Sequence, residues 1–203
     1  MWRSLLSHLV AVAANVGVLA CSSTLPSLAQ LASTLAVPTS QAPLGAGATG
    51  QLADLIKDWE SQKRMLVQLA EAMPADKFGY KPTAPQRSYG EQIMHIAIGN
   101  VEIMKMLGGA ATPPFTIASA ASADTKEEIV KALSDAYDFG TAVLTAQTPE
   151  SINLLLNKDI PFFGGSTRGR VVWSLLSHAM DIYGQMVVYV RLNGIVPPAS
   201  RGI

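Results

Sequence analysis

Apolar side chains recur at helical spacing over four long stretches of the chain. In the first stretch, residues 52–73, they form one stripe and the charged side chains lie elsewhere, as in a helix that buries one face. The stripe consists of Leu52, Leu55, Ile56, Trp59, Leu66, Leu69 and Met73. Prolines at 74, 82 and 85 follow, and proline both lacks an amide hydrogen and restricts the residue before it. The pattern therefore predicts a helix over 52–73 and a loop over 74–87.

Capping motifs mark the starts of the second and third helices. Ser88-x-x-Glu91 predicts the start of a helix that continues to about Leu107, where two glycines end it. Thr125-x-x-Glu128 predicts the start of the third. The core positions expected along the third helix are Ile129, Leu133, Tyr137, Gly140 and Leu144.

The fourth helix is predicted from near Thr167 to Leu192, closed by Asn193-Gly194. Residues 148–166 before it are predicted to be irregular, with one extended stretch at 152–160. Four long amphipathic helices without a convincing series of strands predict an all-α fold, a four-helix bundle. The connections are long for a minimal bundle, which favours crossover connections.

The first 50 residues have a different pattern. Arg3 is followed by an apolar run over residues 9–20, which is short for a membrane span and typical of a secretory signal peptide. Two cleavage sites compete: a lipoprotein box ending in Cys21, and an ordinary site at Ser27-x-Ala29. Residues 22–50 carry no charge and are rich in small residues, which predicts a flexible tether. We therefore expect a signal peptide over 1–21, a tether over 22–50 and one domain over 51–203, exported to the periplasm or cell envelope.

Charge and cysteine content exclude two classes of protein. The chain has 15 basic and 15 acidic residues and no basic stripe, so we expect no binding to nucleic acid. Cys21 is the only cysteine, so no disulfide forms within the domain. The expected partner is a small-molecule ligand. We expect contact with a membrane only through the signal peptide or a lipid anchor. A homodimer is left open.

Two histidines lie in the middle of the second and fourth predicted helices. On the second helix His95 shares a stripe with Glu91 and Glu102. On the fourth, His178 shares a stripe with the expected pocket residues, and Asp181 lies at its edge. Those pocket residues are Ile182, Gln185 and Tyr189. Two inward imidazoles from different helices can form a metal site inside a bundle.

The residues around these histidines carry a family resemblance. The segment HAMDIYGQMVVYVRLNGIVPPAS, residues 178–200, resembles the C-terminal helix and tail of DinB/YfiT-like proteins. The segment RSYGEQIMH, residues 87–95, resembles the second-helix signature of the same family. The resemblance implies a four-helix bundle with crossover connections and a zinc or nickel ion held by three histidines. Family members with known chemistry are largely thiol-dependent transferases and isomerases.

One position departs from the family pattern. The resemblance assigns His95 and His178 as metal ligands, but Ile182 stands where the family has the second histidine of an H-x-x-x-H pair. Three alternatives remain: Asp181 as the third ligand, Glu102 as the third ligand, or no metal at all. A site of two histidines and one carboxylate suits zinc or ferrous iron. The family resemblance favours zinc or nickel over iron.

Two functions follow from these alternatives. The first is a divalent-metal-dependent enzyme of the hydrolase or transferase type, with Asp181 or Glu102 as a third ligand or base. The second is a non-catalytic envelope protein that binds a small apolar ligand or a partner through the degenerate pocket, which Ile182 would make more apolar. A third hypothesis is that the protein is a purely structural component of the envelope.

Overall fold

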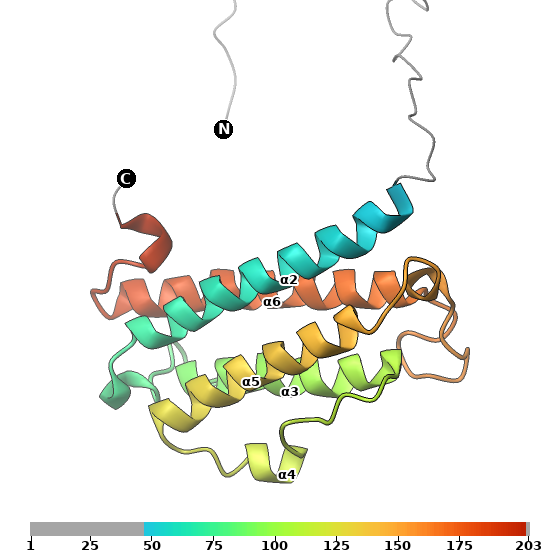
Figure 1. Cartoon of the computed structure of the whole chain (residues 1–203). Helices are drawn as coiled ribbons and strands as arrows, with labels where there is room; N and C mark the ends of the chain where they lie inside the picture. Colours follow the sequence, from blue (N-terminus) through green and yellow to red (C-terminus); the bar gives the residue numbers. More distant parts are fainter. Residues whose placement is uncertain (1–46, 202–203) are drawn as a thin grey trace, which may run out of the picture. The chain divides into compact units, whose positions relative to one another are not determined.

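The computed structural model describes residues 47–201, which form an all-helical domain (Figure 1). The predicted signal peptide and most of the predicted tether lie outside these residues. Four long helices dominate: α2 (Gly47–Ala72), α3 (Tyr89–Met104), α5 (Lys126–Thr145) and α6 (Arg168–Leu192). The short helix α4 (Ile117–Ala120) lies between α3 and α5. Within the described residues β-structure is limited to one isolated bridge between Leu155 and Thr167.

The long helices pack side by side around a shared apolar core. Helix α2 packs against α5 and α6, and α3 packs against the same two helices from the other side (Figure 1). Short 3-10 turns extend the chain at Ala75–Lys77, Lys105–Leu107, Ser151–Asn153 and Pro198–Ser200. None of the described helices is both long enough and apolar enough to cross a membrane.

The capping motifs act as the sequence predicts. Ser88 Oγ accepts a hydrogen bond from the amide of Glu91, and the Glu91 carboxylate accepts one from the amide of Ser88. Thr125 and Glu128 form the same reciprocal pair at the start of α5. Each pair satisfies amide groups that a helix start otherwise leaves unbonded, which confirms the two predicted helix starts.

The predicted core positions are buried, except for the partly buried Ile56, and one glycine explains how closely two helices approach. Trp59 on α2 is fully buried, and its indole nitrogen donates to the backbone oxygen of Tyr137 on α5 at 2.9 Å. The rings of Trp59 and Tyr137 lie 4.7 Å apart between centroids. Gly140 lies directly under the indole, where any side chain would collide with the ring. The α2–α5 contact therefore requires glycine at this position.

Two expectations about element boundaries are wrong, and one short helix was not predicted. Helix α2 begins at Gly47, inside the predicted tether, because once a helix has formed each added residue gains a hydrogen bond at little cost. The extended stretch expected over 152–160 is absent: a 3-10 turn and the single bridge replace it. Helix α4 was not predicted, because one turn of helix has too few residues to show a period.

Candidate metal centre

His95 on α3 and His178 on α6 meet across the interface between these two helices. Their Nε2 atoms lie 3.2 Å apart, and the rings cross nearly edge to face with centroids 5.1 Å apart. Both side chains are partly buried. The sequence prediction that the two imidazoles approach each other is confirmed, whereas their role as metal ligands stays a prediction.

The environment favours the neutral form of both histidines. Burial lowers the pKa of His95, and the positive charge of Arg87 and the neighbouring His178 lower it further. Burial also lowers the pKa of His178, with Arg87 acting in the same direction and the carboxylate of Asp181 opposing them. A neutral imidazole carries the free electron pair that a metal ligand needs. The surroundings of the pair therefore favour the protonation state that binds a metal ion.

A second polar contact lies beside the histidine pair on the same two helices. Gln92, one turn before His95 on α3, donates through Nε2 to the Oε1 atom of Gln185 at 2.8 Å. Gln185 in turn donates to the carboxylate of Asp181 at 3.0 Å. Because an ionised carboxylate only accepts hydrogen bonds, Asp181 fixes the orientation of both amides. The relay leaves Oε1 of Gln92 as an acceptor that is buried and has no partner in the structure, in a side chain only 3% exposed.

The remaining predicted pocket residues line the same interface. Ile182 lies between His178 and Gln185 along α6 and is buried. Tyr189 is also buried, and its hydroxyl donates to the backbone oxygen of Arg87 at 2.8 Å. This bond ties the C-terminal part of α6 to the start of α3. Tyr189 is therefore a structural bridge beside the site.

The structure does not gather a third acidic or histidine ligand. Across residues 47–201 there is no cluster of three or more histidine, cysteine, aspartate and glutamate side chains arranged to hold a metal ion. Asp181 is exposed and held by Gln185, although its charge is close enough to act on the pKa of His178. Glu102 accepts a hydrogen bond from Lys105 at 2.7 Å and is engaged there. Of the two predicted carboxylates, Asp181 alone belongs to the surroundings of the histidine pair.

The geometry of the pair fits two ligands of one ion. The Nε2 atoms of His95 and His178 are 3.2 Å apart, close enough for both to be ligands of one divalent ion, because bonds from histidine to such an ion are about 2.1 Å long. The same distance also suits a hydrogen bond between two neutral imidazoles. The donor set therefore fits a divalent ion in part. His95 and His178 provide two nitrogen ligands, and the remaining ligands would have to come from other groups.

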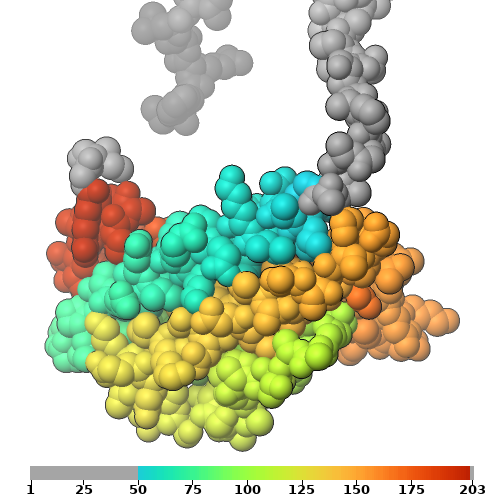
Figure 2. All heavy atoms as spheres, viewed as in Figure 1, coloured from blue at the N-terminus to red at the C-terminus, as the bar shows by residue number. Residues whose placement is uncertain are grey.

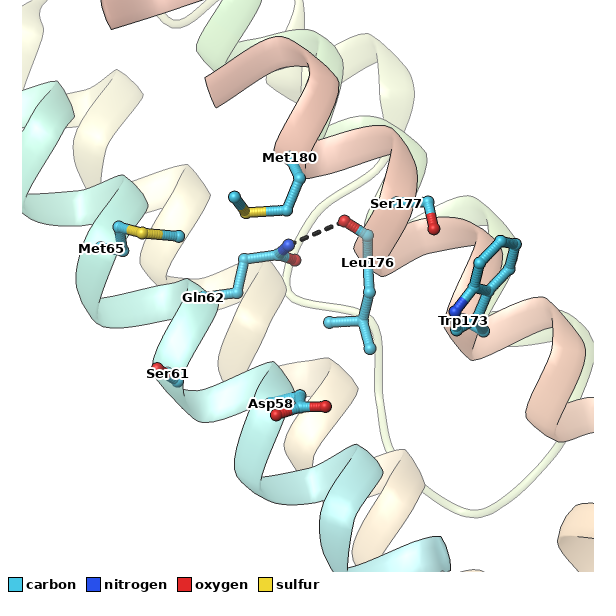
Figure 3. Close-up of a pocket in the computed structure, with 8 residues that line it drawn as sticks. All are labelled: Asp58, Ser61, Gln62, Met65, Trp173, Leu176, Ser177 and Met180. Atoms are coloured by element: carbon cyan, nitrogen blue, oxygen red, sulfur yellow. Dashed lines mark hydrogen bonds between the residues drawn. The ribbon is translucent and has the colours of Figure 1, made fainter. Parts of the chain in front are cut away.

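A surface groove runs elsewhere, between α2 and α6 (Figure 3). It has a volume of about 400 Å³, and Met65 and Met180 lie on its opposite walls. Gln62 closes its floor by donating to the backbone oxygen of Leu176 at 2.8 Å. Since successive helical residues turn by about 100°, the groove side of α6 faces away from His178. The groove is thus separate from the histidine pair.

Comparison with known proteins identifies the family of this helical domain. The model of the DinB family matches residues 48–202, which is most of the chain. The chain belongs to the DinB family. No curated protein and no solved structure gives a significant match. Members of this family are generally associated with metal, and this chain has His95 and His178, two of the three histidines that the family resemblance assigns as ligands.

Two residues of the site were not predicted from sequence. Gln92 could have been recognised, because its i, i+3 spacing from His95 places both side chains on one side of α3. Arg87 could not, because it precedes the helix and no periodicity positions it. Its charge nevertheless acts on the pKa of both His95 and His178.

Proposed function

We propose that the protein is an exported, divalent-metal-binding member of the DinB family, acting as a metal-dependent enzyme of the hydrolase or transferase type. The observation that carries the proposal is the 3.2 Å separation of the Nε2 atoms of His95 and His178. Their lowered pKa values support it, because neutral imidazoles compete best for metal. Imidazole donors favour zinc or nickel, and ferrous iron less so.

Each residue of the site has a separate role in this proposal. His95 and His178 hold the ion, which when bound supplies Lewis acidity and lowers the pKa of a coordinated water. Asp181 lies beside His178 and serves as the base or as the third ligand, which would require its carboxylate to leave Gln185. As long as the bond between them is intact, Gln185 orients the carboxylate of Asp181. Glu102 is the weaker candidate for either role, because Lys105 neutralises it.

Gln92 offers one more candidate metal ligand, the oxygen atom of its side-chain amide. Bundle metal sites elsewhere use a Glu-x-x-His pair on one helix, in which both side chains reach one ion. Gln92-x-x-His95 has the same spacing with an amide in place of the carboxylate. The amide oxygen of Gln92 is buried and without a hydrogen-bond partner, a state that costs stability unless a ligand, a water or an ion uses it. We include Gln92 as a candidate ligand or as an acceptor for a coordinated water.

The location and topology are part of the same proposal. The apolar run before Cys21 supports export and either a lipid anchor at Cys21 or ordinary cleavage. Export favours hydrolase chemistry over thiol transfer, because low-molecular-weight thiols are mainly cytoplasmic. The packing of α2 and α3 each against both α5 and α6 supports a four-helix bundle with crossover connections.

The proposal is tested by metal content and affinity together. The purified full chain, stripped with a chelator, is titrated with zinc and with nickel, alongside His178→Ala and the control Glu127→Gln, which changes an exposed carboxylate on α5. We expect one ion per chain in the parent and in the control, and loss of binding in His178→Ala. Binding that survives His178→Ala, or an absence of binding in a folded parent protein, would refute the metal site. Hydrolysis of ester and amide model substrates by the loaded protein then tests the enzyme assignment.

A non-catalytic function is the second candidate, and a specific observation favours it. Ile182 is buried where the family pattern places a ligand, and the described residues gather no third acidic or histidine donor. In that case the protein binds a small apolar ligand or a partner beside His95 and His178, and the two imidazoles simply share a hydrogen bond. A folded parent protein that binds neither zinc nor nickel would favour this function over the first.

A further inference from the structure

The connection between α5 and α6 displays large apolar side chains to solvent. We call residues 154–167 the Phe162 loop. Phe162 is 98% exposed and Leu155 is 66% exposed, and Leu154 is exposed as well. One exposed leucine is ordinary on a protein surface, but three large apolar side chains in one short loop indicate a binding surface. Phe162 also has a φ of 64°, a left-handed backbone conformation that phenylalanine rarely adopts.

The Phe162 loop is fixed by its own backbone. The amide of Leu156 donates to the oxygen of Ser166 at 2.9 Å, and the amide of Arg168 donates to the oxygen of Leu154 at 3.0 Å. The side chain of Leu156 is buried in the core and anchors the loop from within. The exposed side chains are therefore presented by a defined backbone, so that binding through them would cost little conformational entropy.

The charge around the loop favours an anionic partner. The exposed charged side chains of residues 154–170 are Lys158, Arg170 and Asp159, a net charge of 2 − 1 = +1. Arg168 is partly buried and donates to Gln147 at 2.9 Å, so it adds little to the charge of the loop surface. Apolar tips flanked by basic side chains are typical of segments that sit in the headgroup region of an anionic bilayer.

The loop lies at the end of the domain where the described chain begins. A side chain at Gly169 would contact both Ile152, just before the loop, and the side chain of Gln51 near the start of α2. Figure 1 shows the loop beside the first turns of α2, and Figure 2 shows its orange atoms next to the blue start of that helix. The chain that precedes Gly47 therefore joins the domain at the same end as the Phe162 loop.

We propose that the Phe162 loop inserts its apolar tips into the surface of an anionic phospholipid bilayer. This inference rests on the export in the proposed function, because an envelope protein meets such a surface. It adds a second membrane contact to the one the sequence predicts through the signal peptide or lipid anchor. Two contacts at one end of the domain give stable association where a single lipid chain gives only weak binding. They also fix the orientation of the domain, with the loop end toward the bilayer.

The first experiment measures the depth of the loop in the full chain. Phe162→Trp and the control Leu192→Trp are compared with the parent protein on vesicles of phosphatidylethanolamine and phosphatidylglycerol that contain brominated acyl chains. Leu192 is a matched control because it is 58% exposed and lies at the opposite end of α6. We expect the tryptophan at 162 to be strongly quenched by bromine and the one at 192 to be unaffected. Equal quenching at the two positions would overturn the proposal.

The second experiment removes the apolar tips from residues 22–203, the chain without the predicted signal peptide and without Cys21. Phe162→Ser combined with Leu155→Ser should lower partitioning onto the same vesicles by about tenfold or more, since removing two large apolar groups weakens an interfacial contact by more than about 1.4 kcal/mol. The matched pair Leu192→Ser with Val196→Ser, 58% and 56% exposed, should leave partitioning unchanged.

The two proposals fail in different ways. Partitioning that is unchanged by the loop substitutions, or that is absent from the parent protein, contradicts membrane insertion and assigns the loop to a protein partner. Neither result would argue for or against metal binding at His95 and His178. Loss of metal binding with retained partitioning contradicts the proposed function alone.

Discussion

The Nε2 atoms of His95 and His178 lie 3.2 Å apart, although 83 positions separate the two residues in the sequence. Helix α3 supplies one imidazole and α6 the other, and burial lowers the pKa of both. Placing two polar rings together inside a helical interface costs free energy unless they bond to each other or to a shared ion. The predictions below separate these two uses of the pair.

Restoring the missing histidine should strengthen the site. Ile182→His places an imidazole one turn after His178, at the i, i+4 spacing that lets two histidines bind one ion. We expect zinc affinity to rise by at least about a hundredfold, the larger end of the effects that supporting groups have on metal sites. Calorimetric titration measures it, with Ile182→Leu as the control that keeps the position apolar. An Ile182→His variant that is folded and binds no metal would show that His95 and His178 are ordinary core residues.

Asp181 distinguishes a repaired site from a degenerate one. If its carboxylate completes the site, Asp181→Ala abolishes zinc binding and Ile182→His adds little. If the site has two ligands only, Asp181→Ala lowers affinity slightly, because a nearby negative charge that attracts the divalent cation is lost. Titration of the two variants beside the parent protein separates the cases. The proximity of Asp181 to Gln185 leads us to expect the second result.

Gln92 should matter more for metal binding than for stability. Gln92→Leu removes a buried oxygen that has no hydrogen-bond partner, so the loss of its bond to Gln185 is partly offset. We expect the free energy of unfolding without metal to change by less than about 1 kcal/mol and zinc affinity to fall by about tenfold or more. Urea unfolding and zinc titration measure the two quantities. A variant with unchanged affinity would remove Gln92 from the site.

The histidine pair should make the metal-free domain less stable in acid. Because both folded-state pKa values lie below the ordinary 6.5, the unfolded chain binds more protons than the folded chain as the pH falls through that range. The free energy of unfolding should therefore rise from about pH 5 to about pH 7 and level off above the unfolded pKa. Urea unfolding with a chelator present measures the slope, which should diminish in a His95→Gln, His178→Gln double variant. An equal slope in that variant would assign the dependence to other groups.

Gly140 tests the packing that holds α5 against α2. Gly140→Ala would drive a methyl group into the indole of Trp59, and overpacking of this kind costs about 1–3 kcal/mol. Gly184→Ala is the matched control on α6, where no atom lies within 4 Å of the added methyl group. That substitution should stabilise the domain by about 0.5–1 kcal/mol, because alanine favours a helix over glycine. Thermal unfolding of both variants gives the comparison, and similar midpoints would contradict the packing described for Gly140.

The sequence predicted what local chemistry controls and missed what tertiary contacts control. The reciprocal bonds of Ser88 with Glu91 involve neighbours along the chain, so the start of α3 was predictable. The meeting of His95 with His178 was predictable because each lies on the apolar stripe of a long helix. The orphaned oxygen of Gln92 was not, since it depends on the orientation that Asp181 imposes through Gln185. The irregular segment that contains the Phe162 loop was predicted, but the exposure of its apolar side chains was not, because it follows from backbone pairing across the loop and not from any period.

The ligands of a bound ion distinguish a shared metal site from a hydrogen-bonded histidine pair. X-ray absorption spectroscopy on the full chain loaded with one equivalent of zinc reports the number and type of ligating atoms. We expect a shell that includes two imidazole nitrogens at about 2.0–2.1 Å, with oxygen atoms completing the coordination. The imidazole contribution should fall to one ligand or vanish in His95→Ala. A spectrum without imidazole scattering, in a protein that remains folded, would contradict a shared metal ion between His95 and His178.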